Sequence, residues 1–464
     1  MYNAKIRLLN ANPIRFMKIQ PANSLKGKIR LPGDKSISHR AAILASMAEG
    51  ETRIENFATS ADCASTLDCL KNLGVQIKRE DTTVFIKGIG KTGFTKPEKE
   101  LDCGNSGTTM RLLAGVLAGQ NFDSILAGDE SLSKRPMRRI IEPLEKMGVK
   151  IESKNDCAPL RIYGRNPLQS ISYDLPVASA QVKSCLLLAG LNAEGATKVQ
   201  SPKTKDRVTP SRNHTELMLQ YLGAETKENF LETKDGFIHQ VSIDGNSKLV
   251  AKDIKIPSDV SSAAFFIVGA ACLKGSEIVL ENIGLNPTRT ALIEILQSFR
   301  ADIKIFNQRE ICNESVGDLR IVGGGNFNQK VSSNKINREL VANLIDEIPI
   351  LAVYATQLEN GLEIRGAAEL RVKESDRIKA IVENLRRMSA DVEELPDGFR
   401  VKKSDLKGAK VDSFDDHRIA MAFSIAALFA EGGTEVTGAE CAGVSFPEFY
   451  QTLEHIRKVA GFPI

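Results

Sequence analysis

The stretch LPGDKSISHRAAILASMAEGETRIENF, residues 31–57, contains one complete copy of the pattern that decides the fold. Its first three residues end an extended segment and force a turn, after which Asp34 or Ser36 can cap a helix. An apolar helix then ends at glycine in RAAILASMAEG, 40–50, and a short β-like run, ETRIENF, 51–57, follows it. The unit is therefore a turn, an apolar helix and a strand.

The same pattern recurs about every 75 residues along the chain. Six apolar helices that end at glycine are predicted at 40–50, 109–119, 180–195, 263–275, 349–361 and 418–432. β-like runs follow them at 51–57, 123–129, 196–201, 276–283, 362–367 and 434–439, and amphipathic helices come next at 65–75, 138–149, 214–224, 288–301, 376–388 and 446–459. The six apolar helices are hydrophobic on nearly all sides, so we expect them in the interior.

Six units in 464 residues divide naturally into three plus three, because a chain of this length is too long for one core. The predicted fold is α/β, with two similar globular domains of three helix–strand repeats each, buried apolar helices and small outer sheets. Domain A is expected to comprise residues 1–32 plus 255–464, and domain B residues 33–254. The joint lies near IKIPSDVSS, 254–262, which repeats the strand, turn and helix order of the opening stretch. A general parallel α/β protein with chance internal similarity is the alternative.

The composition excludes several classes of protein. Apolar residues make up 42% and charged residues 26%, which argues against disorder. A net charge of +4 from 62 basic and 58 acidic residues is too balanced for a protein that coats nucleic acid. No stretch approaches the roughly 18 apolar residues that a membrane span needs. We therefore expect neither nucleic acid nor a membrane among the partners.

The eight cysteines form no CxxC pair and have no nearby histidine ligands. They are typical of reduced thiols in a cytosolic protein, and no metal site is predicted. The first 33 residues carry seven Lys or Arg and no acidic residue, yet they lack the apolar segment of a targeting peptide. We expect the folded part to open at Met17 with one strand and a turn, and residues 1–16 to be a tail or an upstream start.

Polar clusters stand at the starts of the interior helices, where an apolar core helix does not need them. Lys35, Ser36 and Arg40 lie at the first turn of the first helix. Free backbone N–H groups and the positive end of the helix dipole favour an anion there, and the two cations add charge and donors. An ordinary capped helix with solvated Lys and Arg side chains would explain the same residues.

Further clusters follow the same logic. They are GNSGTTMR (104–111), SLSKRPMRR (131–139) with Arg135, LPVASAQVK (175–183) with Ser179 and Gln181, SRNHTE (211–216) with Arg212, LIDEIPIL (344–351), ELRVKESDR (369–377), and DDHR (415–418) with His417 and Arg418. Gly107 allows close backbone approach, and a helix through ELRVKESDR would place Lys373 and Arg377 on one face with Glu374 beside them. If these starts face one cleft, the site is strongly positive, holds two carboxylates and suits two small polyanions. Dipole stabilisation of Asp346 and solvated salt pairing are the structural alternatives.

Nine short segments, taken in order from Met17 onward, resemble motifs of one known family: LPGDKSISHR, GNSGTTMR, KRPM, SAQVKS, NPTRT, IDEIPILA, RVKESDR, DDHRIAMAF and SFPEF. The family is 5-enolpyruvylshikimate-3-phosphate synthase (3-phosphoshikimate 1-carboxyvinyltransferase), and several segments are similar to its bacterial class II branch. The resemblance implies a two-domain enolpyruvyl transferase fold. It also implies transfer of the enolpyruvyl group of phosphoenolpyruvate to the 5-hydroxyl of shikimate 3-phosphate, with release of phosphate and without a cofactor. We expect a cytoplasmic monomer.

Roles follow from the resemblance, motif by motif. Shikimate 3-phosphate is expected at Lys35, Ser36, Arg40, Ser179, Gln181, Arg212, Asp346 and Lys373. Phosphoenolpyruvate is expected at Lys35, Gly107, Arg135, Gln181, Arg377 and Arg418. The resemblance makes Asp346 the base on the 5-hydroxyl, while Glu374 and Lys35 handle protons at the enolpyruvyl carbon and the departing phosphate.

The chain departs from the family pattern at a few positions. A serine pair of part of the family reads Ser179-Ala180 here, and a lysine of many members is Val444. Gly107 is the residue that the family associates with room for the inhibitor glyphosate, so we expect appreciable inhibition. Leu112, where some members have proline, leaves the degree of sensitivity open.

Three other functions compete with this prediction. The related enolpyruvyl transferase that acts on UDP-N-acetylglucosamine has a reactive cysteine in the loop before its Arg-Pro, but the loop GDESLSKRP, 128–136, has none. An RNA-terminal phosphate cyclase has related repeats, but its nucleotide-binding signatures are not visible here. A non-catalytic anion-binding scaffold would have no need of Asp346 or Glu374.

Overall fold

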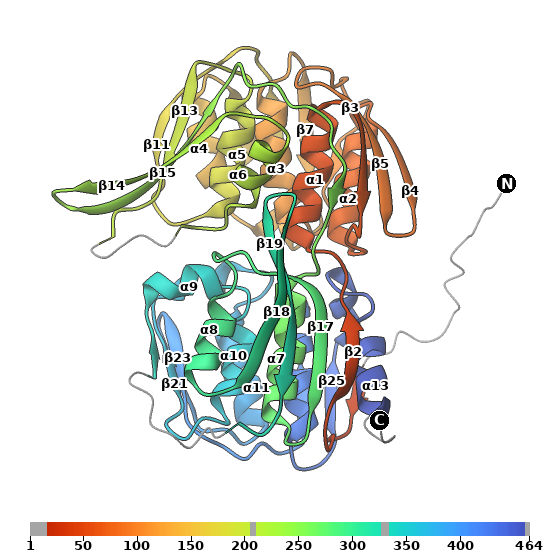
Figure 1. Ribbon diagram of the computed structural model, residues 1–464. Coiled ribbons are helices and arrows are strands. Elements are labelled where there is room, and N and C mark those ends of the chain that lie inside the picture. The colour runs from red at the N-terminus through yellow and green to blue at the C-terminus, as the bar shows by residue number, and fades with distance from the viewer. Residues whose placement is uncertain (1–15, 205–209, 326–333, 460–464) are drawn as a thin grey trace.

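The computed structural model describes residues 16–204, 210–325 and 334–459, which form two lobes (Figure 1). The B lobe holds the elements from α1 to β16. The A lobe holds β1, β2 and everything from α7 onward, so that β2 lies beside β17, far from it in the sequence. The expected tail was 1–16, and its residues 1–15 lie outside the described residues.

The predicted apolar helices form the interior of both lobes. They are α1 (Lys35–Met47), α3 (Gly107–Ala118) and α5 (Ala180–Gly190) in the B lobe, and α7 (Val260–Cys272), α10 (Ile348–Ala355) and α12 (His417–Ala426) in the A lobe. Every residue of α10 is buried, as is all of α12. These helices bury nearly all of their sides because they carry small and aliphatic residues all round, which confirms the prediction of interior helices.

The amphipathic helices also form where the sequence predicts them. They are α2 (Ala61–Asn72), α4 (Arg138–Lys146), α6 (His214–Tyr221), α8 (Ala291–Ser298), α11 (Arg377–Arg387) and α13 (Phe449–Val459), and a short helix, α9 (Arg338–Leu344), is added. In α4, for example, Ile140, Ile141 and Leu144 are buried while Glu142 and Glu145 are exposed. Such helices pack against the core of the lobe with one apolar face.

Small sheets cover the helices. In the B lobe the strands are β3 (Glu49–Glu55), β4 (Gln76–Glu80), β5 (Thr83–Ile89), β6 (Leu101–Asp102), β7 (Asp123–Ala127), β8 (Lys150–Lys154), β9 (Cys157–Tyr163), β10 (Leu168–Gln169), β11 (Ser172–Asp174), β12 (Ala193–Glu194), β13 (Ala196–Gln200), β14 (Thr226–Thr233), β15 (Gly236–Asp244) and β16 (Ile254–Lys255). They form four-stranded sheets of order β16-β3-β5-β4, β6-β7-β9-β8 and β11-β13-β15-β14, and the pair β10-β12. The three four-stranded sheets have the same design, as three copies of one unit should.

The A lobe repeats this arrangement. Its strands are β1 (Phe16–Ile19), β2 (Lys26–Arg30), β17 (Glu277–Gly284), β18 (Asp302–Ile311), β19 (Glu314–Val322), β20 (Lys335–Ile336), β21 (Leu362–Ile364), β22 (Val392–Leu395), β23 (Gly398–Val401), β24 (Lys410–Asp412) and β25 (Thr434–Thr437). Their sheets have the order β18-β19-β17-β2, β20-β21-β23-β22 and β1-β25-β24. The two-domain α/β fold with three repeats a domain is thus confirmed.

The single strand expected at the start of the folded part is wrong. The segment forms two strands in different sheets, because β1 pairs antiparallel with β25 and β2 pairs parallel with β17. Pro21, which lies between them, has no N–H to donate to a ladder and favours a break.

Two separate apolar cores lie under the sheets. One joins Ile19, Leu25 and Ile29 to residues 260–456, and the other lies within residues 37–256. We propose domain boundaries on this basis, with domain A at 1–32 plus 255–464 and domain B at 33–254, although Ile256 still packs with the B lobe.

The two crossings between the lobes run side by side. Asp34 N donates to Pro257 O at 2.8 Å, and Asp259 N donates to Pro32 O at 3.0 Å. Asp34 then caps α1 and Asp259 caps α7, so the same turn and cap begin both lobes. Gly33 is required here, because a Cβ at this position would lie 1.7 Å from the carbonyl oxygen of Asn56. Among the described residues, no helix is long and apolar enough to cross a membrane.

Candidate active site

A cavity of about 1400 Å³ lies between the lobes. Every predicted site residue lines it: Lys35, Ser36, Arg40, Gly107, Arg135, Ser179, Gln181, Arg212, Asp346, Lys373, Glu374, Arg377 and Arg418. The first turns of α1, α3, α5 and α12 all contribute lining residues. The prediction that the interior helix starts face one cleft is therefore confirmed, and their free N–H groups and dipoles favour anions there.

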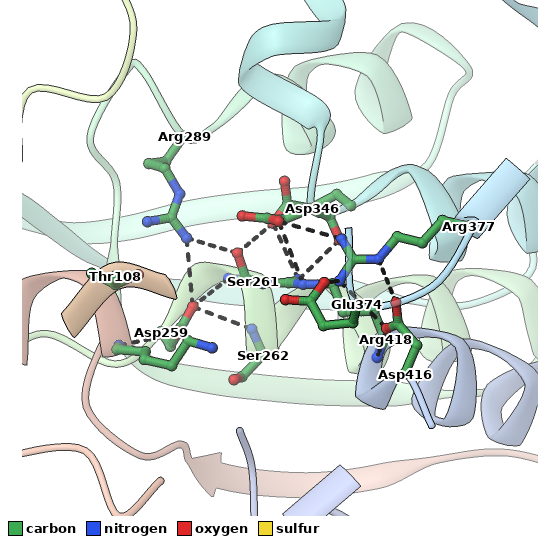
Figure 2. Close-up of polar contacts among 12 residues, drawn as sticks. Thr108, Asp259, Ser261, Ser262, Arg289, Asp346, Glu374, Arg377, Asp416 and Arg418 are labelled. Atoms are coloured by element: carbon green, nitrogen blue, oxygen red, sulfur yellow. Dashed lines mark hydrogen bonds and ion pairs between the residues drawn. The ribbon is translucent and has the colours of Figure 1, made fainter. Parts of the chain in front are cut away.

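Asp346 lies just before α10 and faces cations from both lobes. Figure 2 shows it beside Arg377 and Arg418 of the A lobe. Its Oδ2 is 2.5 Å from Nη2 of Arg212, and its Oδ1 is 3.6 Å from both Arg377 Nη1 and Arg418 Nε. Burial opposes ionisation of this carboxyl, but Arg418, Arg212, Lys373 and Arg377 hold its pKa well below the usual range. Asp346 is therefore a carboxylate throughout the neutral range.

Glu374 is the second carboxylate. Its Oε2 accepts from Arg377 Nη2 at 2.6 Å, and its Oε1 is 3.3 Å from Arg135 Nη1 across the cavity. Burial opposes its charge, but Arg377, His417, Arg135 and Lys373 hold the pKa of Glu374 well below its usual range. Two carboxylates are thus held ionised by a larger number of cations.

Arg377 is the most buried cation of the site, at 1% exposure. It lies between Glu374 and Asp416, and Asp416 Oδ2 accepts from its Nε at 2.7 Å (Figure 2). Its Nη1 has no hydrogen-bond partner within the described residues, although a buried donor is costly to leave unpaired. This donor is available to an anionic ligand.

The helix expected through ELRVKESDR is wrong. A short 3₁₀ turn, η2 (Ala368–Val372), ends there, residues 373–376 are irregular, and α11 begins at Arg377. Asp376 is the reason, because its side chain accepts from Lys379 N and caps a new helix. Lys373 and Glu374 reach the cavity from the irregular segment and not from one helix face.

Lys35 extends from the first turn of α1 to Asp62, a residue of α2 that the sequence analysis missed. Its Nζ lies 2.9 Å from Asp62 Oδ2. Burial opposes the charge on Lys35, but Asp62 raises its pKa, so Lys35 is an ammonium in the unliganded site. By contrast, burial lowers the pKa of Lys373. Asp62 lies before the helix predicted at 65–75, which in the structure begins earlier, at Ala61, and is capped by Ser60.

Arg40 is nearly buried, and burial lowers its pKa to about 10, so it still carries its charge at neutral pH. Its Nε donates to Thr215 Oγ1 at 2.7 Å and its Nη2 to Ser184 Oγ at 2.9 Å. Arg40 is therefore held in place by α5 and α6 at the base of the cavity.

Gln181 is oriented by two neighbours. Arg111 Nη1 donates to Gln181 Oε1 at 2.9 Å, and Gln181 Nε2 donates to Thr108 Oγ1 at 3.0 Å. Burial lowers the pKa of Arg111 to about 10, so a further cation lies beside Gly107. Arg111 lies in the motif GNSGTTMR, 104–111, but was not predicted as a site residue.

One further ion pair joins the lobes at the edge of the cavity. Arg139 Nη1 of α4 donates to both carboxylate oxygens of Glu369, at 2.9 and 3.0 Å. The two side chains are 41% and 39% exposed, so solvent screens them.

A double-mutant cycle on Arg139→Ala and Glu369→Ala measures what this pair contributes. We expect a coupling energy in KM of about 0.5 kcal/mol at low salt, which disappears in high salt, because exposed pairs gain little. Steady-state KM values at two ionic strengths provide the measurement. A coupling that salt leaves unchanged would contradict this view of the pair as exposed and screened.

Comparison with known proteins identifies the fold and the family. The enolpyruvyl transferase NikO of Streptomyces tendae has the same fold, with a TM-score of 0.70 over 95% of this chain and 97% of its own at 16% identity. This likeness shows the fold that the two chains share, with two lobes of three repeats each.

The sequence identifies the family, because residues 19–453 match the sequence model of EPSP synthase (3-phosphoshikimate 1-carboxyvinyltransferase). The chain is 46% identical to the 3-phosphoshikimate 1-carboxyvinyltransferase of Koribacter versatilis over 96% of this chain and 99% of the relative. An EPSP synthase structure from Acinetobacter baumannii superposes with a TM-score of 0.81 at 41% identity, covering 95% and 97% of the two chains. The chain belongs to the EPSP synthase family, which confirms the resemblance seen in the motifs.

Proposed function

We infer that this protein transfers the enolpyruvyl group of phosphoenolpyruvate to the 5-hydroxyl of shikimate 3-phosphate. The products are 5-enolpyruvylshikimate 3-phosphate and phosphate, in the shikimate pathway to chorismate and the aromatic amino acids. One observation carries the proposal: Asp346 and Glu374 lie in one cavity among cations contributed by both lobes. Membership of the EPSP synthase family supports the same reaction.

The two substrates share the cavity in this proposal. Shikimate 3-phosphate is held by Lys35, Ser36, Arg40, Ser179, Gln181, Arg212, Asp346 and Lys373, and phosphoenolpyruvate by Lys35, Gly107, Arg135, Gln181, Arg377 and Arg418. Both substrates are anions that repel each other, so bringing them together needs an excess of positive charge. Arg377 Nη1 has an ion-pair contact with Asp346 but no hydrogen-bond partner among the described residues, which supports its role as a donor to one of them.

The proposed reaction is an addition followed by an elimination. Asp346 accepts the proton of the 5-hydroxyl as its oxygen bonds to C2 of phosphoenolpyruvate, while the Lys35 ammonium donates a proton to C3. In the second step the Glu374 carboxylate takes the proton that C3 loses, and the C–H electron pair forms the double bond as the bond from C2 to the phosphate oxygen breaks. Glu374 passes this proton to the departing phosphate, and the proton held by Asp346 restores the Lys35 ammonium. Protons and electron pairs balance without a cofactor.

Asp346 is a weak base in the unliganded site, because its surrounding cations lower its pKa. A dianionic substrate that binds Arg212 and Lys373 would offset these cations and raise the pKa of Asp346. The base would therefore become stronger when its substrate arrives.

Phosphate release tests the proposal. Purified protein is assayed with phosphoenolpyruvate plus shikimate 3-phosphate, with each substrate alone, and as Asp346→Ala. We expect release that needs both substrates and is lost in the variant. Silence with both substrates, followed by release with phosphoenolpyruvate plus UDP-N-acetylglucosamine, would overturn the proposal in favour of the related transferase.

Glyphosate is expected to inhibit the wild-type enzyme, and Gly107→Ala to raise the inhibitory concentration by about tenfold or more. A Cβ at position 107 would lie 2.6 Å from Arg111 Nη1, so this side chain would have to shift, whereas the 3.5 Å approach to Arg135 Nη1 is an ordinary contact. The KM for phosphoenolpyruvate should rise as well, because Arg111 orients Gln181, a proposed ligand of phosphoenolpyruvate. Inhibition curves of both proteins provide the measurement, and undiminished wild-type turnover at high glyphosate would contradict it.

We also propose that the protein is a cytoplasmic monomer. The eight cysteines are all free, which suits a reducing compartment. Light scattering on the protein as it elutes from a size-exclusion column tests the monomeric state. Fractionation of the cells tests the cytoplasmic location.

A further inference from the structure

Arg289 lies at the junction of the two lobes and belongs to the motif NPTRT, 286–290, for which no role has been assigned above. Its side chain is buried, with 3% of the residue exposed, just before α8. Its Nη1 is 3.3 Å from Asp34 Oδ2 and 3.2 Å from His214 Nε2, both of the B lobe. Its Nη2 donates to Ser261 Oγ at 2.7 Å and is 3.6 Å from Asp259 Oδ1, both of the A lobe (Figure 2). One guanidinium thus bridges both lobes.

Two of these partners lie within two residues of a residue in the proposed mechanism. Asp34 caps α1 and directly precedes Lys35, whose backbone N–H donates to Asp259 Oδ2 at 3.2 Å. His214 begins α6, two residues after Arg212. The position of Arg289 is therefore tied to the segments that carry a proposed proton donor and a proposed substrate ligand.

The third partner leads to the proposed base. Ser261 donates to the carboxylate of Glu347, which is next to Asp346 and stands at the N-cap position of α10. Arg289 is thus linked to the segments that carry Lys35, Arg212 and Asp346. The links are Asp34, His214 and Ser261, respectively. Arg212 and Asp346 come from different lobes, and their 2.5 Å contact exists only if the lobes keep this orientation.

His214 strengthens the same junction. Arg289 Nη1 donates to its Nε2, so its Nδ1 carries the proton and donates to Glu314 Oε1 at 2.6 Å. The other carboxylate oxygen of Glu314 accepts from Asn286 at 3.0 Å, and Asn286 also donates to Asn213 of the B lobe at 2.8 Å. The first and fourth residues of NPTRT therefore both cross between the lobes.

We propose that Arg289 is a positioning residue of the enolpyruvyl transfer, whose guanidinium fixes the orientation of the two lobes so that Lys35, Arg212 and Asp346 meet in one site. The proposal rests on the proposed function. Arg289 lines the cavity, but Nη1 and Nη2 each lie against two protein groups, so the guanidinium fork acts through its neighbours. Its role depends on the fork shape of the guanidinium, because one nitrogen cannot reach Asp34, His214 and Ser261 together.

Arg289→Lys keeps the charge and removes the fork, so it tests the proposal. We expect kcat to fall about 100-fold while KM for either substrate changes less than tenfold, since misplaced groups lower kcat more than binding. The matched control is Arg320→Lys, an arginine of the same lobe that pairs with Glu277 at the surface, and it should keep wild-type kcat. A wild-type kcat in Arg289→Lys would overturn the proposal, because a positive charge without the guanidinium fork would then be enough to hold the lobes.

A second measurement needs no turnover. Small-angle X-ray scattering of the unliganded proteins should give a larger radius of gyration for Arg289→Lys than for the wild type and Arg320→Lys, since the lobes lose a bridge. If the wild type releases no phosphate, the proposed function fails, but this comparison still tests the bridge. If Arg289→Lys does not fold, Ser261→Ala removes one arm of the fork and should lower kcat about tenfold, and an unchanged kcat there would count against the proposal.

Discussion

Asp346→Asn is expected to lower kcat by about 10³-fold, in line with the loss of a general base. Asparagine keeps the size of aspartate and can accept a hydrogen bond from Arg212, but it cannot take the proton of the 5-hydroxyl. The change also removes one negative charge from a site rich in cations, so binding of anionic shikimate 3-phosphate should hold or improve. Steady-state phosphate release and calorimetric binding of shikimate 3-phosphate separate the two effects.

The matched control for this prediction is Asp397→Asn. Asp397 also lines the cavity, but it accepts from Gly366 N and pairs with Arg365 at the edge. It should keep kcat within about twofold of the wild type, because surface pairs contribute little. A kcat for Asp346→Asn near that of the control would mean that another group accepts the proton.

Much of the fold could be predicted from the sequence because the repeat is strong in hydrophobicity. Helices such as α7 and α10 are apolar on all sides, and the glycine after each interior helix marks where a strand begins. The failures were local. The break after η2 depends on Asp376 as a helix cap, and the split of the first strand depends on the distant partners β25 and β17. Neither is visible in hydrophobic periodicity.

The site could be predicted to the extent that its residues lie at helix starts. Arg40 and Arg418 stand out because core helices do not need cations. The contacts across the cavity could not be predicted, because the sequence does not show which start faces which. Arg135 meets Glu374 and Lys35 meets Asp62 only after the two lobes and their helices have packed. Arg289 was hidden for the same reason, since its partners are 28 to 255 residues away.

Glu374→Gln is expected to lower kcat by about 10²- to 10³-fold, because glutamine cannot transfer the proton at C3 of the enolpyruvyl group. The variant should leave the neighbouring arginines in place. Arg377 keeps its 2.7 Å contact with Asp416, and Arg135 keeps its 2.8 Å contact with Asn105. The KM for phosphoenolpyruvate should therefore change less than kcat does.

Deuterium exchange from solvent into the methylene group of phosphoenolpyruvate distinguishes proton transfer from positioning. Exchange at C3 requires reversible proton addition, so Glu374→Gln should lose it together with turnover if Glu374 or its partner Lys35 handles that proton. Glu339→Gln is the matched control, since Glu339 lines the same cavity from α9 but is exposed and bonded only to Asn337 in the contacts described for it. Full exchange in Glu374→Gln, with turnover lost, would assign Glu374 to phosphate departure and leave the C3 proton to Lys35, whose pKa Asp62 already raises against the effect of burial.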